Sequence, residues 1–268
     1  MTLIGCVHEL QKLEESVTGL RTQLDRAIDR QRRFAADVSH ELRTPVAGLR
    51  AQLEEAQLNP GETDLDGLID RALHDVDRLQ AIITDLHLLA QLEASTVPAP
   101  RERVDLAELV QAVVSRRVDI RQVKLQLERG VVVSGVPAKI SRAFIELLDN
   151  AQRHAKRTVQ VWVRRIDDTA ELAVADDGEG IALPDRERIF ERFSRLDEAR
   201  CRDRGGTGLG LPIVRAIASA HQGTVEVEDS PIGGAAFVIH LPLADVSEPA
   251  SSAPLSGGHD ATTFTPSS

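Results

Sequence analysis

The stretch Phe34-Ala-Ala-Asp-Val-Ser-His-Glu-Leu-Arg-Thr-Pro-Val46 lies in a long amphipathic pattern. Small or apolar residues recur at steps of three, four or their sums and predict the buried face of a helix: Ala35, Val38, Leu42 and Leu49. His40 lies about 200° around the helix from Val38 and from Leu42, away from that face. Thr44 shares the His40 side, Glu41 is adjacent, and Pro45 predicts a bend or soft point. An exposed imidazole beside a carboxylate and a hydroxyl is therefore expected.

Two further apolar seams flank this stretch. They comprise Leu10, Leu13, Val17, Leu20, Leu24 and Ile28, and then Leu65, Ile69, Ala72, Val76, Leu79, Ile83, Leu86 and Ala90. Their steps of three and four predict two long helices. Asn59-Pro-Gly61 predicts the turn between them, and Thr63 or Asp64 can cap the second helix. One hairpin cannot bury both seams, so we expect two copies to pair into a homodimeric four-helix bundle.

Composition narrows the class of protein. The chain has 268 residues, a net charge of −10 at pH 7 and two cysteines, Cys6 and Cys201. This length allows two domains, and the acidity argues against non-specific nucleic-acid binding. The cysteines form neither a disulfide framework nor a metal-ligand spacing, which fits a reducing cytosol. No apolar run approaches the roughly 18 residues that cross a bilayer, and the start is not a signal peptide, so we expect the chain as given to be cytoplasmic.

After the hinge-like run Ala94-Ser-Thr-Val-Pro-Ala-Pro100 the pattern becomes mixed. Helical periodicity marks 106–114, 138–154 and 211–218, and strand-like runs are 124–127, 130–134, 159–163, 171–175, 224–227 and 236–241. These runs predict an α+β sandwich with helices on one face of a mixed sheet. The Ser-, Thr-, Pro-, Ala- and Gly-rich residues 245–268 predict a disordered tail.

Two polar clusters in this region are candidates for a ligand site. Glu146-Leu-Leu-Asp-Asn-Ala-Gln-Arg-His154 lies late in a predicted helix, where the amide of Asn150 offers the oxygen ligand that Mg²⁺ prefers. Glu146 lies one turn earlier as a second candidate ligand. Asp176-Asp-Gly-Glu-Gly-Ile181 ends a predicted strand and places a carboxylate beside two glycines. Gly178 and Gly180 would allow the backbone to approach closely.

Two more clusters follow. Ile189-Phe-Glu-Arg-Phe-Ser-Arg195 begins a charged segment that would be mobile unless a ligand orders it, with Phe190 and Phe193 as anchors. Gly205-Gly-Thr-Gly-Leu-Gly-Leu211 then opens onto a helix, and its N–H groups together with the helix dipole make an anion site. No Gly-Lys-Ser/Thr follows these glycines, which excludes a Walker A loop.

The run Ser39-His-Glu-Leu-Arg-Thr-Pro45 resembles the H-box of sensor histidine kinases, and the four clusters resemble the N, G1, F and G2 boxes of Bergerat-type ATPases in the family order. The resemblance spans residues 32–242. It implies His40 as phospho-acceptor, Glu41 as the group that orients it and accepts its proton, and Thr44 as a hydroxyl that positions a water for phosphatase activity. It implies Mg²⁺ at Asn150 and Glu146, a lid over ATP in the F-box segment, and a nucleotide site. That site would comprise Asn150, Arg153, His154, Asp176, Gly178, Gly180, Gly206, Thr207, Gly208, Leu209 and Gly210.

The resemblance also implies a division of the chain into five parts. These are a partial HAMP-like signalling helix (1–30), the dimerisation and histidine phosphotransfer domain (31–93), a hinge linker (94–102), the catalytic ATP-binding domain of the Bergerat or GHKL fold (103–244) and the tail (245–268). The implied partners are a second copy and the receiver domain of a response regulator, with no nucleic acid. Any membrane contact would be made by segments absent from this chain, in a parent protein anchored in the cell membrane.

The function expected from this resemblance is autophosphorylation of His40 from Mg-ATP and transfer to an aspartate of the regulator. One alternative is an ATP-binding dimeric scaffold without kinase output. A second is an ATPase of the Hsp90, MutL and gyrase kind, against which an exposed His-Glu pair on a dimerising hairpin argues. A nucleotide-dependent label on His40 separates the kinase from both.

Overall fold

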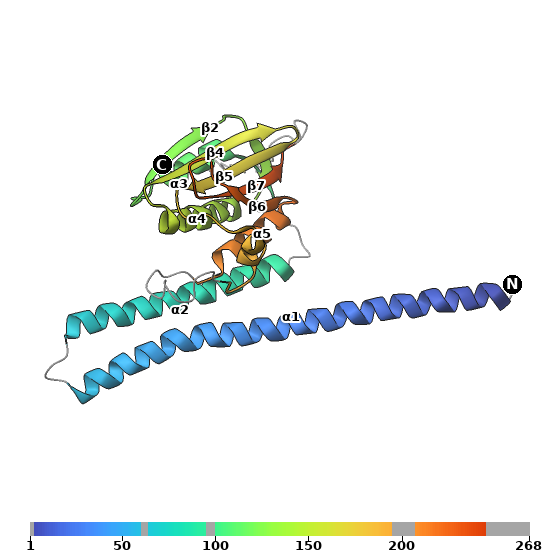
Figure 1. The fold of residues 1–268 in the computed structure, drawn as a ribbon, viewed down its shortest axis with the longest axis horizontal. Coiled ribbons are helices and arrows are strands. Elements are labelled where there is room, and N and C mark those ends of the chain that lie inside the picture. Colours follow the sequence, from blue (N-terminus) through green and yellow to red (C-terminus); the bar gives the residue numbers. More distant parts are fainter. Residues whose placement is uncertain (1–2, 60–63, 95–99, 195–206, 245–268) are drawn as a thin grey trace, which may run out of the picture.

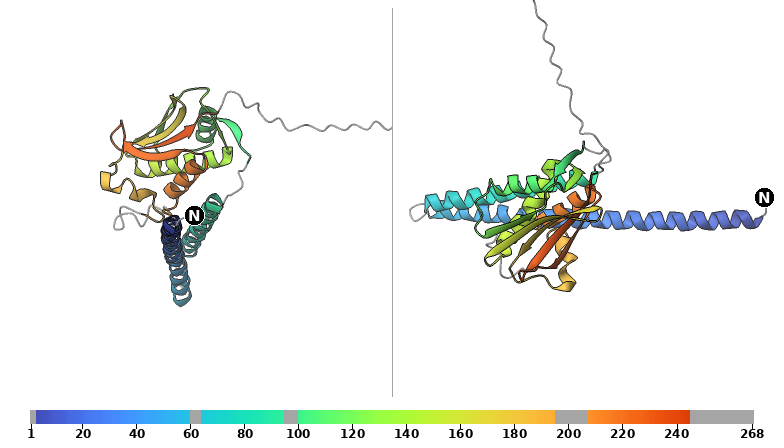
Figure 2. Two further views of the ribbon diagram at one scale, coloured as in Figure 1. Left: turned by 90° about the vertical axis from the view of Figure 1, so that its right-hand side faces the viewer. Right: turned by 90° about the horizontal axis from the view of Figure 1, so that it is seen from above.

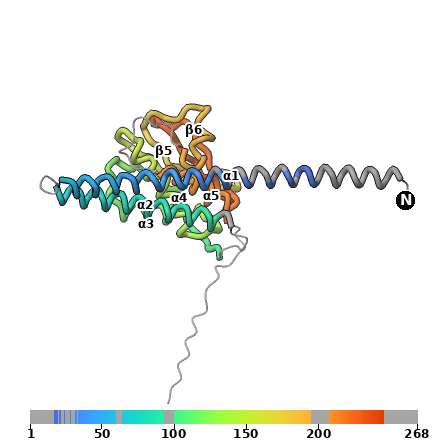
Figure 3. The backbone as a smooth tube through the Cα atoms, turned by 90° about the horizontal axis from the view of Figure 1, so that it is seen from below, coloured from blue at the N-terminus to red at the C-terminus, as the bar shows by residue number. Residues whose placement is uncertain are grey.

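The N-terminal part is a hairpin of two long helices. The structure is a computed structural model that describes residues 3–59, 64–94, 100–194 and 207–244. Helix α1 spans Leu3–Leu58 and α2 spans Leu65–Ala94. They lie side by side, and α1 extends far beyond α2 toward the N-terminus (Figure 3). The predicted hairpin is therefore confirmed, although Gly61 of its turn lies outside the described residues.

Polar side chains and a proline shape the hairpin locally. Oδ1 of Asp64 accepts from the backbone N–H of Gly67 at 3.2 Å, so Asp64 caps α2; the other candidate, Thr63, is outside the described residues. Helix α1 continues through the buried Pro45 without a break in its assignment. The proline removes one hydrogen bond there, but the packing of α1 against α2 maintains the helix.

The C-terminal part alternates strands and helices as the sequence predicts. Its elements are β1 (Glu102–Asp105), α3 (Leu106–Val114), β2 (Gln122–Leu127), β3 (Val132–Gly135), α4 (Pro137–His154), β4 (Thr158–Ile166), β5 (Thr169–Asp176), the 3-10 helices η1 (Leu183–Asp185) and η2 (Arg188–Phe190), α5 (Gly210–Ala220), β6 (Thr224–Asp229) and β7 (Ala235–Pro242). The sequence reading missed β1, which begins inside the predicted linker. Within the described residues β1 pairs with β3 alone, and its four residues are too few to show a clear strand periodicity.

The main sheet is mixed, with strand order β2-β4-β5-β7-β6. Strand β2 runs parallel to β4, and every other pair in this sheet is antiparallel. Helices α4 and α5 lie on one face of the sheet (Figure 1). The predicted α+β sandwich is confirmed, and β1 and β3 form a separate two-stranded sheet beside it.

Local chemistry starts two of the helices. The side chain of Asp105 accepts from the backbone N–H groups of Ala107 and Glu108 at 2.9 and 3.2 Å, which caps α3. Pro137 occupies the first turn of α4, where its missing N–H costs no helical hydrogen bond. Along β4, Val159, Val161 and Val163 alternate with more exposed residues, so this strand presents its apolar face to the helices.

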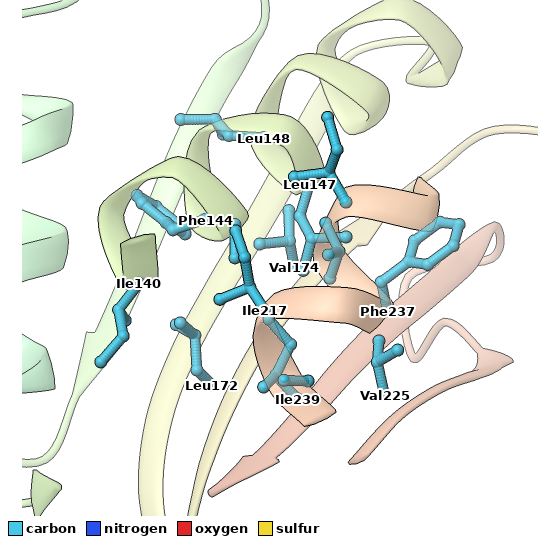
Figure 4. Packing of buried hydrophobic residues seen from close by; sticks show 14 of the residues in the cluster. Ile140, Phe144, Leu147, Leu148, Leu172, Val174, Ile217, Val225, Phe237 and Ile239 are labelled. Atoms are coloured by element: carbon cyan, nitrogen blue, oxygen red, sulfur yellow. The ribbon is translucent and has the colours of Figure 1, made fainter. Parts of the chain in front are cut away.

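The core of the C-terminal domain lies between the main sheet and helices α4 and α5. Figure 4 shows Phe144 and Leu147 of α4 and Ile217 of α5 pointing toward Leu172 and Phe237 of the sheet. The core therefore fixes α4 and α5 side by side. The polar side of α4 carries the predicted Mg²⁺ ligands, and the glycine-rich segment leads into the first turn of α5.

The sheet domain sits on the hairpin through α2 (Figures 1 and 2). Helix α2 packs against α5 on the side opposite the sheet, and Ile82 and Leu89 of α2 belong to the same buried cluster as the sheet-domain core. Several residues of the predicted α2 seam, among them Leu65, Ile69 and Ile83, are exposed in the single chain, and Ile82 and Leu89 lie on another face of the helix. The buried face of α2 is thus turned toward the second domain.

Candidate active site

His40 is exposed on α1, as its position in the helical pattern predicts. Its carbonyl accepts from the hydroxyl of Thr44 at 3.3 Å. Glu41 is half-buried, and its Oε2 lies 3.7 Å from Nη2 of Arg78 on α2. The three predicted residues are therefore together, but Glu41 is drawn toward α2 by an arginine that the sequence reading did not single out.

Asp176 lies at the end of β5 with only 2% of its surface exposed. Its Oδ1 accepts from the N–H groups of Gly178 at 2.8 Å and Ala235 at 3.3 Å. Burial raises the pKa of this carboxyl, and the two backbone hydrogen bonds oppose that shift. Among the described residues, the hydrogen bonds to this carboxylate are both made to Oδ1, so Oδ2 is the candidate acceptor for a ligand.

The glycines around Asp176 make room for it. A Cβ at Gly178 would lie 2.7 Å from Oδ1 of Asp176 and from the carbonyl oxygen of His154. Gly180 has a φ of 76°, a left-handed conformation that favours glycine. A Cβ at Gly234 would collide with the same carboxylate oxygen. This contact could not be predicted from the sequence, because residues 176 and 234 are brought together by the pairing of β5 with β7.

Helix α4 carries the second group of predicted residues. Glu146, Asn150, Arg153 and His154 follow one another at helical spacing, so they share one side of α4. Asn150 is half-buried and His154 is exposed, while Nε of Arg153 donates to the carbonyl of Asp149 at 3.2 Å. Burial raises the pKa of Glu146, and Arg142 one turn earlier opposes that shift from 2.6 Å.

These α4 residues fit Mg²⁺ as oxygen donors rather than as a complete cage. An amide and a carboxylate one turn apart are ligands that Mg²⁺ takes in proteins, usually alongside phosphate oxygens. Within the described parts of the chain there is no group of three or more His, Cys, Asp or Glu able to hold a metal ion. The donor set of Asn150 and Glu146 therefore suits an ion that is shared with a nucleotide.

The glycine-rich segment begins α5. Of its predicted residues, Thr207, Gly208, Leu209 and Gly210 are described, whereas Gly206 lies outside the described residues. Gly208 has a φ of 72°, and its carbonyl accepts from Phe193 N–H at 2.9 Å. Helix α5 starts at Gly210 without a side-chain cap, and its N-terminus lies beside Glu146, because a Cβ at Gly210 would clash with Oε2 of that residue. The fold thus joins the α4 residues and the glycine-rich segment in one place.

The segment predicted as a lid is described only in part, since residues 195–206 lie outside the described residues, Cys201 among them. Its first anchor, Phe190, is buried, and its ring meets Phe237 edge-on at 6.3 Å. The guanidinium of Arg192 lies 4.5 Å from the ring centroid of Phe34 on α1. The described end of this segment therefore contacts α1, the helix that carries His40. The contacted residue, Phe34, lies six residues before His40 in the sequence.

One buried carboxylate at this junction was not foreseen. Asp85 of α2 is 3% exposed; Nη2 of Arg142 donates to its Oδ1 at 2.7 Å and the hydroxyl of Thr207 donates to its Oδ2 at 3.2 Å. The sequence does carry one signal, because Asp85 interrupts an otherwise apolar helical face between Ile82 and Leu89.

Comparison with known proteins agrees with this arrangement. Residues 30–95 match the His Kinase A (phospho-acceptor) domain, and residues 135–245 match the histidine kinase-, DNA gyrase B- and HSP90-like ATPase family. The chain is 33% identical to the signal transduction histidine-protein kinase BaeS of Escherichia coli over 249 residues, which cover 88% of this chain and 52% of BaeS. It is 37% identical to the probable sensor histidine kinase TcrY of Mycobacterium tuberculosis over 230 residues, which cover 83% of this chain and 48% of TcrY.

A solved structure shares the fold. The Acinetobacter baumannii histidine kinase AdeS superposes with a TM-score of 0.63 at 24% identity, covering 77% of this chain and 98% of that one. The chain spans about half the length of the curated relatives it matches. Within its described helices, no stretch is both long and apolar enough to cross a membrane. The phospho-acceptor hairpin, the ATPase-type domain and these relatives together show that the chain carries the phospho-acceptor and ATP-binding domains of a sensor histidine kinase.

Proposed function

We propose that this chain phosphorylates His40 from Mg-ATP and passes the phosphoryl group to an aspartate in the receiver domain of a response regulator. The observation that carries the proposal is the placement of two sites on one chain. His40 is exposed on the hairpin, and Asp176 presents Oδ2 as a candidate acceptor in a domain that contacts α1 through Arg192 and Phe34.

The proposed reaction is an in-line displacement. A neutral ring nitrogen of His40 attacks the γ-phosphorus, the new N–P bond forms as the bond to the bridging oxygen breaks, and ADP leaves. The proton on the other ring nitrogen passes to Glu41 or, through it, to water. Arg78 of α2 lies 3.7 Å from Glu41 and attracts that carboxylate, so the proton transfer would require Glu41 to turn toward His40.

The nucleotide would lie across α4 and α5. We propose that Oδ2 of Asp176 accepts from the adenine amino group and that the backbones of Gly178 and Gly180 lie against the base. The N-terminal N–H groups of α5 would meet the phosphates; the segment concerned comprises Gly206, Thr207, Gly208, Leu209 and Gly210. Arg153 and His154 would contact phosphate and the nucleotide rim.

Mg²⁺ would be held by Asn150 and Glu146 on α4 together with phosphate oxygens. When bound, it neutralises charge that develops on the transferred group. The half-buried amide of Asn150 supports this role because it is a neutral oxygen donor that needs no counter-charge. Glu146 must first turn from Arg142, which holds it at 2.6 Å.

We also propose that the hairpin removes the phosphoryl group from the regulator. The hydroxyl of Thr44 lies one turn from His40 on the same side of α1 and donates to the His40 carbonyl. Rotation of this hydroxyl would let it orient a water toward a phospho-aspartate. One of the relatives, MprB of Mycobacterium ulcerans, is named a kinase/phosphatase, at 35% identity over 239 residues.

The proposed functional unit is a homodimer. Apolar residues of the hairpin that are exposed in the single chain include Val46, Leu53, Leu65, Ile69, Leu73, Val76 and Ile83. Two such hairpins would cover these residues in a four-helix bundle. Helix α1 runs without interruption from Leu3 past His40, which supports a role for residues 1–30 as a HAMP-like signalling helix.

The test is incubation with γ-labelled Mg-ATP, with wild type beside His40→Gln and Asn150→Ala. We expect a label that is acid-labile and alkali-stable, and that both substitutions abolish. ATP binding without a label on His40 would favour a scaffold, or an ATPase if phosphate is released. Transfer is tested by adding a receiver domain to the labelled protein and following the label.

A further inference from the structure

Asp85 connects the hairpin to the predicted nucleotide site. It belongs to α2, yet both of its carboxylate oxygens are bound by the other domain, one by Arg142 of α4 and one by Thr207 of the glycine-rich segment. The hydroxyl of Thr207 also accepts from the N–H of Leu209 at 3.3 Å, so its single proton is committed to Asp85. An acidic side chain of the hairpin thus uses donors at the place proposed for phosphate.

The charges at this contact are not balanced. Nη2 of Arg142 donates to Asp85 and also lies 2.6 Å from Glu146. One guanidinium therefore pairs with two carboxylates, of which Asp85 is buried and Glu146 is half-buried. Burial raises the pKa of Asp85, and Arg142 and Thr207 offset that shift. Within the described residues, Nε of Arg142 is buried without an acceptor. A buried ion pair with an unsatisfied donor contributes little net stability.

An open pocket lies beside the apolar contact between α2 and the other domain. Ile82 and Leu89 of α2 are buried in that contact. The neighbouring pocket has a volume of about 460 Å³ and is lined by Leu89 and Leu92 of α2 and by Phe190, Pro212 and Arg215 of the other domain. The stacking of Arg192 on Phe34 is a further contact between the hairpin and this domain. Domains joined by partly polar interfaces of this kind commonly move relative to one another.

We propose that Asp85 is an autoinhibitory contact that competes with nucleotide phosphate for Thr207 and Arg142. The docked arrangement is then the resting state, and nucleotide binding releases the ATP-binding domain from α2. Both anions need the same donors, and a phosphate next to Thr207 would face the carboxylate of Asp85 at close range. This inference rests on the proposed nucleotide site and adds its regulation.

The central test is the affinity for a non-hydrolysable Mg-ATP analogue, measured by calorimetry on the full chain. Asp85→Asn keeps the shape and removes the charge, and we expect it to bind the analogue at least about fivefold more tightly than wild type, since docking reduces the population competent to bind. Asp77→Asn is the matched control, because it removes the same charge from an exposed position of the same helix. We expect the affinity of Asp77→Asn to equal that of wild type. Equal affinities for Asp85→Asn and Asp77→Asn overturn the proposal.

A second measurement follows domain separation without using activity. Spin labels on cysteines introduced at Asp77 of α2 and Lys124 of β2, with Cys6 and Cys201 changed to serine, report the distance between the domains. We expect the analogue to lengthen or broaden this distance in otherwise wild-type chain, and Asp85→Asn to do so without nucleotide. A distance that neither change affects contradicts release.

The outcomes separate this inference from the proposed kinase function. If Asp85→Asn binds the analogue more tightly but His40 is never labelled, the contact stands and the kinase proposal fails. If wild type labels His40 and Asp85→Asn labels it more slowly at unchanged affinity, Asp85 positions the domain for transfer and the competition is refuted. If wild type binds no analogue at all, both proposals fail.

Discussion

The backbone N–H of Gly178 donates to Oδ1 of Asp176 at 2.8 Å, at the end of the buried strand β5. Ala235 holds the same oxygen from the neighbouring strand. The carboxylate is thus fixed before any ligand arrives. A preorganised acceptor loses little conformational freedom on binding, which favours selection of one base.

Asp176→Asn should weaken ATP binding by roughly 10- to 100-fold, because an amide cannot both accept from the two backbone N–H groups and present a second acceptor to adenine. The measurement is calorimetric titration with Mg-ATP. Glu179→Gln, an exposed neighbour, is the control that should leave affinity unchanged. Equal affinities for the two variants would place adenine elsewhere.

Glu41→Gln should slow autophosphorylation of His40 by about 100-fold while leaving ATP affinity unchanged, because the proposed role of the carboxylate is in proton transfer rather than nucleotide binding. The measurement is the initial rate of labelling at saturating Mg-ATP. Glu55→Gln, an exposed carboxylate on the same helix, should label at the wild-type rate. A normal rate for Glu41→Gln would show that water alone takes the proton.

Gly208→Ala should weaken nucleotide binding and lower the unfolding free energy by about 1–3 kcal/mol. Its φ of 72° strains any Cβ, and that Cβ would lie 2.8 Å from Cα of Phe193. Gly233→Ala separates strain from collision, because Gly233 has a φ of 104° but nothing within 4 Å of its Cβ position. Urea unfolding followed by the fluorescence of Trp162, the single tryptophan, reports this domain. If both variants lose the same stability, the contact with Phe193 has no energetic role.

His221 should make the ATP-binding domain less stable as pH falls. The Val136 N–H donates to Nε2 at 3.0 Å, so the proton resides on Nδ1 and is donated to the Ile217 carbonyl at 2.7 Å. Burial lowers the pKa of His221, so the unfolded chain binds more protons and stability rises with pH. The contribution is complete above about pH 6.5, the ordinary histidine pKa, and is lost below it by at most about 1.4 kcal/mol per pH unit.

The measurement is the unfolding free energy at pH 7.5 and pH 5.5, again from Trp162 fluorescence. His221→Leu should reduce the difference between the two values, because no ring remains to be protonated. His240→Gln removes a different histidine and should retain the wild-type difference. An unaltered difference in His221→Leu would assign the pH dependence to other groups.

Val76→Asp should convert the proposed homodimer to a monomer. Val76 is 45% exposed in the single chain and lies in the apolar seam of α2, so a charge there would be buried without a partner in a four-helix bundle. Sedimentation velocity measures the change. The control is Val118→Asp, because Val118 is a fully exposed loop residue of the other domain. This variant should remain a dimer. A dimer that survives Val76→Asp would require a different interface.

The sequence by itself determined the two long helices, most strands and the exposure of His40. Each depends on periodicity along the chain, such as the three- and four-residue steps around Val38 and Leu42, and periodicity is a local property. The placement of Asp176 at the end of a buried strand was predictable for the same reason.

The tertiary structure alone decided which distant residues meet. The β5–β7 pairing brings Gly234 and Ala235 to Asp176, the hairpin brings Arg78 to Glu41, and the packing of α2 on α5 brings Asp85 to Arg142 and Thr207. These contacts join segments up to 122 residues apart. They arise because apolar faces must be buried together, and only after that burial does a polar residue acquire its partners.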